Sequence, residues 1–232
     1  MSSTSADRYR SVVARAAEAA VRSGRAPAEV TVVVAAKTFG ADRVREVVAA
    51  GAREIGENYV QEARRKAAEL RLPQVQWHLI GRLQRNKVKQ ALSLFRLIHS
   101  LDRLDLAEAL DSAAAQIGTT APCLVEVNLG DEKSKGGVSP DALGALLEAA
   151  AQLGHLSIEG LMTIPPPGSV DASRRSFARL RGLRDRFADL RLPNVQLKEL
   201  SMGMSSDFEA AIAEGATLVR IGTAIFGPRK WR

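Results

Sequence analysis

A lysine at the end of a short apolar run is the first residue whose type and position suggest chemistry. The run from Thr31 to Phe39 reads TVVVAAKTF and is rich in β-branched residues, as is typical of a strand. Both faces are apolar until Lys37, which predicts a buried parallel strand that ends at this lysine. A lysine where an apolar interior opens can act as an amine nucleophile. The alternative is a lysine that merely ends a strand and points into water.

Three further predicted strands carry polar side chains on the face that alternation assigns to the interior. These side chains are Glu126 and Asn128 in CLVEVN, His78 in VQWHLI, and Arg220 in TLVRIG. An interior arginine keeps its charge and therefore needs a partner. The partner is either Glu126 or another carboxylate, or it is a ligand. Together with Lys37, these residues predict a polar site at one end of a sheet.

The loops SMGMSSDF and RIGTAIFG, which follow the last two predicted strands, have the composition of an anion site. Ser205, Ser206 and Thr223 supply hydroxyls, and Gly222 allows close approach of the backbone. The alternative is that Ser206 and Glu209 form a capping box, which needs no ligand. A lysine amine beside a phosphate cradle is what pyridoxal phosphate (PLP) requires, because the lysine forms the Schiff base and the cradle holds the phosphate.

The elements that would position these residues alternate regularly along the chain. A lead helix over 6–23 precedes a strand over 30–37, and seven further strand-helix units follow. Eight such units predict a single (β/α)8 barrel of the TIM type over residues 1–232, with residues 1–5 disordered. An open doubly wound sheet is the alternative, but AAKTFGAD is not its glycine-rich phosphate fingerprint.

Composition excludes or disfavours several other classes of protein. The chain has 232 residues, of which 46% are hydrophobic, and a single cysteine, Cys123. A disulfide within the chain is therefore excluded and a cytoplasmic setting is expected. No apolar run reaches membrane-spanning length, and MSSTSADRYR lacks the apolar core of a signal peptide. The net charge of +7 allows a nucleic-acid partner, but basic and acidic residues are interspersed and only 4% of residues are aromatic, which disfavours it.

Seven motifs, in order, carry a family resemblance. They are AAKTF, GENYVQE, WHLIGRLQRNK, VNLGDEKSKGG, GLMTIPP, SMGMSSDFEAAI and VRIGTAIFG. Over about residues 30–228 the chain closely resembles the pyridoxal-phosphate homeostasis protein family, whose members are single domains with the barrel of alanine racemase. Gly136 and Gly137, in the long polar loop 131–139, are a mild variation on the family pattern.

The resemblance implies a PLP site. It implies a Schiff base on Lys37 and an arginine, Arg220, facing the pyridine nitrogen, with Asn58 and Met202 lining the cofactor. The full set of implied PLP-binding residues is Lys37, Asn58, Met202, Ser205, Ser206, Arg220, Gly222 and Thr223. No metal is implied.

The resemblance also implies a function. An arginine at the ring nitrogen leaves that nitrogen unprotonated and disfavours transaminase or decarboxylase chemistry. Racemases use a tyrosine from a second domain as second base; here the chain ends at Arg232, and Tyr59 is expected to pack at the start of a helix over 58–71. We therefore expect a monomeric, cytoplasmic, non-catalytic PLP carrier that serves PLP-dependent apoenzymes. The alternatives are an amino-acid racemase and, more remotely, a nucleic-acid-binding barrel.

Overall fold

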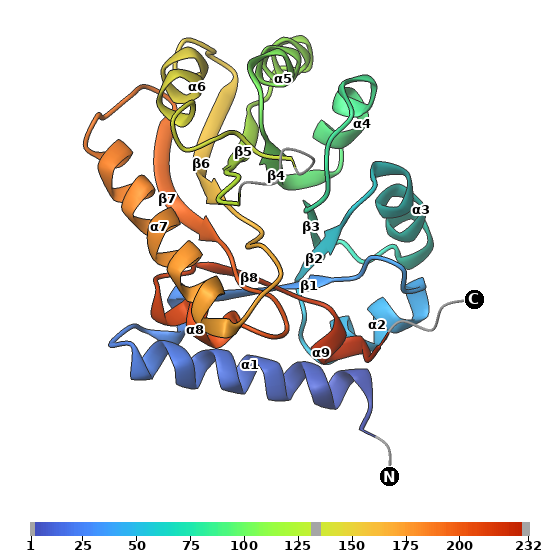
Figure 1. The fold of residues 1–232 in the computed structure, drawn as a ribbon. Coiled ribbons are helices and arrows are strands. Elements are labelled where there is room, and N and C mark those ends of the chain that lie inside the picture. The colour runs from blue at the N-terminus through green and yellow to red at the C-terminus, as the bar shows by residue number, and fades with distance from the viewer. Residues whose placement is uncertain (1–2, 131–135, 229–232) are drawn as a thin grey trace.

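Eight parallel strands close into a barrel in the computed structural model, which describes residues 3–130 and 136–228. Each strand pairs with the next in sequence and β1 pairs with β8 (Figure 1). This confirms the predicted TIM-type barrel. The strands are β1 (Thr31–Ala35), β2 (Glu54–Glu57), β3 (Gln76–Leu79), β4 (Phe95–Leu101), β5 (Ala121–Glu126), β6 (Leu156–Met162), β7 (Val195–Ser201) and β8 (Leu218–Ile221).

Helices connect the strands and surround the barrel (Figure 1). They begin and end within a few residues of the sequence-based boundaries. The α-helices are α1 (Ser5–Arg22), α2 (Ala41–Ala49), α3 (Val60–Leu70), α4 (Val88–Leu92), α5 (Leu104–Gln116), α6 (Leu143–Ala150), α7 (Val170–Ala188), α8 (Phe208–Ala213) and α9 (Thr223–Phe226), with short 3-10 helices η1 (Pro27–Glu29) and η2 (Arg85–Lys87).

The apolar core has two layers. The larger layer lies between the strands and the helices, and the smaller one fills the barrel interior. Its members come from five strands and the residue after β3, and they are Val33, Ala35, Ile80, Leu97, Leu124, Met162 and Leu218. Val33 and Ala35 share a strand face with Lys37, and Leu218 shares one with Arg220. The predicted inward faces of these two strands are therefore confirmed.

The structure describes the N-terminal segment from residue 3, and α1 begins at Ser5. The Thr4 hydroxyl accepts a hydrogen bond from the Asp7 backbone N–H, and the Asp7 carboxylate accepts one from the Thr4 N–H. This capping box satisfies N–H groups that the first turn of α1 would otherwise leave unpaired. Residues 1 and 2 lie outside the described residues.

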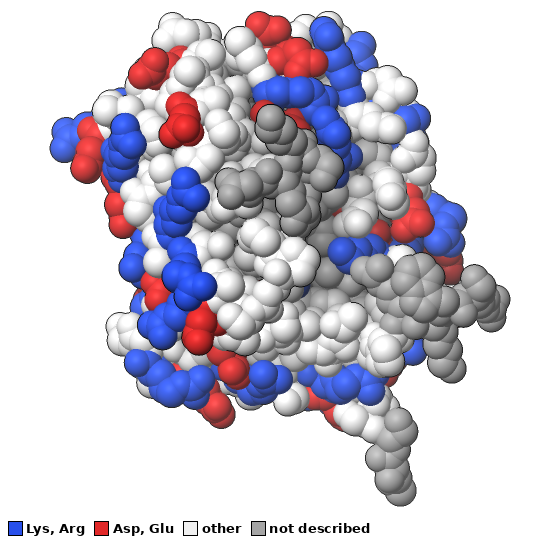
Figure 2. All heavy atoms as spheres, in the orientation of Figure 1, with Lys and Arg blue, Asp and Glu red and all other residues white. Residues whose placement is uncertain are grey.

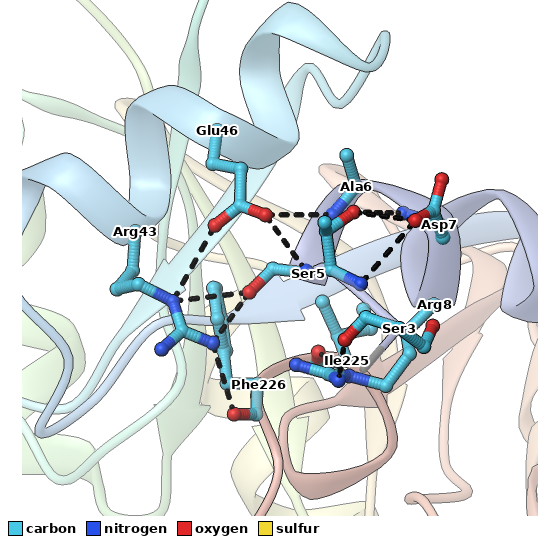
Figure 3. Close-up of polar contacts among 10 residues, drawn as sticks. Ser3, Ser5, Ala6, Asp7, Arg8, Arg43, Glu46, Ile225 and Phe226 are labelled. Atoms are coloured by element: carbon cyan, nitrogen blue, oxygen red, sulfur yellow. Dashed lines mark hydrogen bonds and ion pairs between the residues drawn. The ribbon is translucent and has the colours of Figure 1, made fainter. Parts of the chain in front are cut away.

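Side chains from α2 and the backbone of α9 anchor the start of α1 (Figure 3). Glu46 Oε1 accepts hydrogen bonds from the N–H groups of Ser5 (2.8 Å) and Ala6 (3.3 Å). Arg43 donates to the Ser5 hydroxyl and, at 3.1 Å, to the Phe226 carbonyl. The long first helix is therefore fastened to the short helix that ends the barrel.

The surface mixes charges of both signs. On the face in Figure 2, lysines and arginines lie beside aspartates and glutamates around the rim, and the described residues near the centre are mostly uncharged. Cys123 is a buried free thiol. Within the described ranges, the helices all lack the length and apolarity needed to cross a bilayer.

Candidate functional site

A cavity of about 290 Å³ opens at the carboxyl ends of the strands, where the barrel fold concentrates function. Its lining comes from the ends of β1, β2, β3 and β8 and from the loops after β6, β7 and β8. The lining residues are Ala35, Lys37, Phe39, Asn58, Ile80, Ile164, Met204, Ser205, Ser206, Arg220, Gly222 and Thr223. The structure thus brings together all but one of the eight predicted cofactor-binding residues, and Met202 is the exception.

Lys37 lies in a tight turn directly after β1. The Phe39 N–H donates to the Ala36 carbonyl at 3.1 Å, and Thr38, the third residue of this turn, has a φ of 72°. Positive φ is unfavourable for a β-branched residue, and such strain concentrates at functional sites. The half-buried Lys37 side chain lines the cavity, and not the outer surface of the barrel.

A buried ion pair supports this turn from behind. Lys66 on α3 donates to the Ala36 carbonyl at 2.9 Å and to Glu57 Oε1 at 2.5 Å. Both side chains of the pair are almost fully buried. Burial raises the pKa of the Glu57 carboxyl, although the bond to Lys66 opposes the rise. Since Asn58 directly follows Glu57 in the chain, the pair ties the turn at Lys37 to a second residue that lines the cavity.

Asn58 is held close to the end of β3. A Cβ added at Gly81 would lie 2.5 Å from the Asn58 carbonyl oxygen. Only glycine avoids that clash. Tyr59, the next residue, is 63% exposed, so the prediction that its ring packs at the start of the helix is wrong.

The loops after β7 and β8 meet at the other side of the cavity. Ser205 Oγ accepts a hydrogen bond from the Ala224 N–H at 3.1 Å, which joins the two loops. A Cβ at Gly222 would lie 3.2 Å from the Ala35 carbonyl oxygen, so glycine lets β8 approach β1 closely. Hydroxyls of Ser205, Ser206 and Thr223 therefore converge with backbone N–H groups, and this donor set suits a phosphate.

The capping box that Ser206 and Glu209 could have formed is absent at the start of α8, which the structure describes in full. Asp207 precedes the helix, and its carboxylate accepts from the Met204 N–H at 2.7 Å. Glu209 instead pairs with Arg15 on α1 at 3.0 Å. Ser206 is thus left at the exposed rim of the cavity.

Met202 is fully buried in the outer core, whereas Met204 lines the cavity. Gly203 between them has a φ of 91°, and a Cβ there would lie 2.5 Å from the Ala211 Cβ. The left-handed turn at this glycine reverses the direction of the chain, which is why the second methionine, and not the first, reaches the site.

Arg220 is 5% exposed and lines the cavity from β8. It donates to the Ser201 hydroxyl at 2.5 Å and to the Thr163 carbonyl at 2.9 Å. Burial lowers the pKa of Arg220 to about 10, although Glu126 and Asp207 favour the charged form. The guanidinium therefore stays charged at neutral pH.

Glu126, one of the partners considered for Arg220, does not form an ion pair with it within 4 Å among the residues that the structure describes. The two groups interact over a longer distance, and burial together with Asp102 raises the pKa of the Glu126 carboxyl. Asn128 Oδ1 accepts from the Gly130 N–H at 3.1 Å. The neighbouring loop residues 131–135, for which no role was predicted, lie outside the described residues.

Polar residues inside the barrel that sequence reasoning missed are Glu54, His99 and Ser201, which are joined by hydrogen bonds to His78 or Arg220. His78, which alternation placed inside, is fully buried, and its Nδ1 lies 2.9 Å from His99 Nε2. His99 shares a strand face with the interior residue Leu97, so the same alternation applied to FRLIHS would have found it.

Known proteins resemble the chain over nearly its whole length. The model of the alanine racemase N-terminal domain matches residues 8–230. The pyridoxal phosphate homeostasis protein of Pseudomonas aeruginosa is 47% identical over 231 residues, covering 99% of this chain and 97% of that protein. The protein of the same name from Escherichia coli K12 is 41% identical over 216 residues, covering 92% of each.

Solved structures of similar proteins share the fold of this chain. PipY of Synechococcus elongatus PCC7942, solved with PLP bound, superposes with a TM-score of 0.83 at 41% identity, covering 93% of this chain and all of that one. An alanine racemase from Clostridium difficile 630 shares the fold, with a TM-score of 0.73 at 13% identity, and this chain covers 57% of it. On identity, coverage and fold together, the chain belongs to the pyridoxal phosphate homeostasis protein family.

Proposed function

We propose that this protein binds PLP through a Schiff base between the PLP aldehyde and Lys37 Nζ and takes part in intracellular PLP homeostasis. One observation carries the proposal. The lysine, the hydroxyl-rich loops and the buried arginine line the same cavity, in a chain of this family.

The chemistry of the cavity fits the parts of PLP. Ser205, Ser206 and Thr223 supply donors for the phosphate, and Arg220 supplies donors for the ring nitrogen. Phe39 and Ile80 offer apolar surface for the ring. The cavity volume of about 290 Å³ suits a small ligand.

Bound PLP supplies an electrophilic aldehyde and an electron-accepting ring. The side chains around it determine how far the ring acts as an electron sink. A buried, charged Arg220 donates hydrogen bonds and has no proton to give up at neutral pH, so it does not favour a protonated ring nitrogen. This supports a carrier without efficient turnover.

An amino-acid racemase is the second candidate, because the matching family model is the alanine racemase N-terminal domain. Racemisation needs a second base on the other face of the substrate. The described lining residues include no tyrosine, and Tyr59 is exposed outside the cavity. The mixture of charges in Figure 2 lends no support to the more remote nucleic-acid-binding alternative. A cytoplasmic setting, a monomeric state and transfer to PLP-dependent apoenzymes complete the proposal.

Titration of the purified protein with PLP, followed by absorbance, tests binding. Lys37→Ala should abolish the absorbance of the Schiff base, whereas Lys89→Ala, which removes an exposed lysine on α4, should leave it unchanged. Loss of optical rotation with alanine and serine tests turnover. Rapid racemisation that disappears in Lys37→Ala would replace the carrier proposal with the racemase.

A further inference from the structure

A continuous hydrogen-bonded chain of side chains crosses the interior of the barrel, from the cavity to the opposite end. Arg220 Nη1 donates to Ser201 Oγ at 2.5 Å, and Ser201 Oγ lies 2.9 Å from His99 Nδ1. His99 Nε2 lies 2.9 Å from His78 Nδ1, and His78 Nε2 lies 2.7 Å from Glu54 Oε2. We call these five residues the barrel relay.

The barrel relay is closed to solvent along most of its length. His78, His99 and Ser201 are fully buried and Arg220 is 5% exposed. Only Glu54, whose side chain is 23% exposed at the start of β2, reaches the other end of the barrel. Buried polar groups of this kind require a complete set of hydrogen bonds.

The direction of each hydrogen bond follows from its two ends. A guanidinium only donates, so Ser201 Oγ accepts from Arg220. Among the residues that the structure describes, the other partner of this hydroxyl is His99 Nδ1. The Ser201 proton must therefore go to that nitrogen, which makes His99 Nδ1 an acceptor.

The remaining bonds are then determined. An imidazole that accepts at Nδ1 carries its proton on Nε2, so His99 donates to His78 Nδ1. His78 in turn accepts at Nδ1 and donates from Nε2 to Glu54. Burial, followed by the neighbouring His78 ring and then the charge of Arg220, holds the pKa of His99 well below its usual value, in agreement with a neutral ring. Near the Glu54 end of the barrel relay, His78 interacts with Glu159, which in turn interacts with Arg96, Glu199 and Lys198. Arg53 and Glu54 both act on the Tyr9 hydroxyl.

We infer that His78 and His99 are both neutral Nε2–H tautomers and that Glu54, His78, His99 and Ser201 are positioning residues, which orient the Arg220 guanidinium toward the cavity. The arginine is thereby held by neutral acceptors, while the carboxylate at the end of the barrel relay, Glu54, lies at the far end of the barrel. The remaining guanidinium donors stay directed at a ligand, and among the described residues no carboxylate lies within ion-pair distance to compete for them, although Glu126 and Asp207 act on the arginine from farther away.

The direct test is a long-range ¹H–¹⁵N spectrum of the histidine rings in the purified, ¹⁵N-labelled full chain. The sequence has three histidines, and His155, whose side chain is 50% exposed, serves as the internal reference. We expect His78 and His99 to show an unprotonated Nδ1 and a protonated Nε2 at about pH 7. An imidazolium or an Nδ1–H tautomer at either buried ring would overturn the inference.

A matched pair of variants tests the positioning role. Ser201→Ala removes the donor to His99 Nδ1, so the ¹⁵N resonance of that nitrogen should shift, while Nε2 keeps its proton because His78 Nδ1 still accepts it. Ser173→Ala, which removes another buried serine hydroxyl on α7, should leave the His99 signals unchanged. An unchanged His99 Nδ1 resonance in Ser201→Ala would contradict the assigned hydrogen-bond direction.

The effect on the ligand rests on the proposed function. PLP should bind roughly tenfold more weakly to Ser201→Ala than to the wild type, because Arg220 loses one charged hydrogen bond that fixes its orientation, and Ser173→Ala should bind normally. Unchanged PLP affinity in Ser201→Ala would overturn the positioning role. Failure of the wild type to bind PLP would refute the proposed function, whereas the tautomer result would still decide the barrel relay.

Discussion

The buried ion pair of Lys66 and Glu57 holds the turn that presents Lys37 to the cavity. Lys66→Met should lower the free energy of unfolding at neutral pH by about 3–5 kcal/mol, since it leaves a buried carboxylate without its cation. Urea denaturation monitored by circular dichroism measures this loss.

The same variant should become more sensitive to pH. The pKa of Glu57 is already raised in the folded protein, and removal of Lys66 raises it further. The folded state then retains a proton that the unfolded state releases, so stability is lost as the pH rises through the folded pKa. Unfolding measured at pH 5 and pH 8 should show that Lys66→Met loses more stability, relative to the wild type, at pH 8. The double variant Glu57→Gln, Lys66→Met should lose the same stability at both pH values. An equal loss at both pH values in Lys66→Met alone would contradict the account.

Ser205 is the hydroxyl best placed to distinguish PLP from a ligand without a phosphate. Its oxygen accepts a hydrogen bond from the Ala224 N–H, which leaves its own proton available to the phosphate. Ser205→Ala should weaken PLP binding about tenfold and leave the binding of pyridoxal, which lacks the phosphate, nearly unchanged. Parallel absorbance titrations with both ligands measure the ratio. Ser176→Ala, on the distant helix α7, is the control, and an equal loss for both ligands would rule out a phosphate contact.

Much of the candidate site could be predicted at the residue scale, because strand alternation and loop position are local properties. They located Lys37, Arg220 and the serine-rich loop. They did not reveal the Ser201–His99 contact, whose residues are 102 positions apart in sequence. The family resemblance placed Met202 at the cofactor, and the left-handed turn at Gly203, which brings Met204 to the cavity instead, cannot be seen in the order of residues.

At the element scale, α1 contributes to the fold through the contacts at its first turn. Glu46→Ala should lower the free energy of unfolding by about 1–2 kcal/mol, because the N–H groups of Ser5 and Ala6 lose their acceptor. Glu18→Ala, which removes a glutamate of α1 that is 68% exposed, should change the free energy of unfolding by less than about 0.5 kcal/mol. Thermal unfolding of the two variants provides the comparison, and equal effects would mean that the first turn does not anchor the helix.

The elements were predicted well because each strand and helix carries its own periodicity and its own ending signals. The capping box alternative at Ser206 failed for a tertiary reason. Glu209 turns to Arg15 on α1, a contact between segments that no local pattern connects.

At the scale of the whole molecule, barrel closure depends on close approach of neighbouring strands. A Cβ at Gly160 on β6 would lie 1.9 Å from the Glu199 carbonyl oxygen on β7. Gly160→Ala should therefore cost at least about 3 kcal/mol of stability. Gly182→Ala, on α7 with no atom within 4 Å of the added Cβ, should stabilise by about 0.5–1 kcal/mol. Chemical denaturation should show that the free energy of unfolding falls in Gly160→Ala and rises in Gly182→Ala. A Gly160→Ala variant as stable as the wild type would contradict the strand register.

Covalent capture of PLP at one lysine is the central claim for the whole protein. Borohydride reduction of the PLP-loaded protein, followed by proteolysis and mass spectrometry, tests it most directly. We predict that the visible absorbance is lost and that a single stable pyridoxyl adduct appears on the peptide that contains Lys37. An adduct on another lysine, or none on a protein that still binds PLP, would contradict the account.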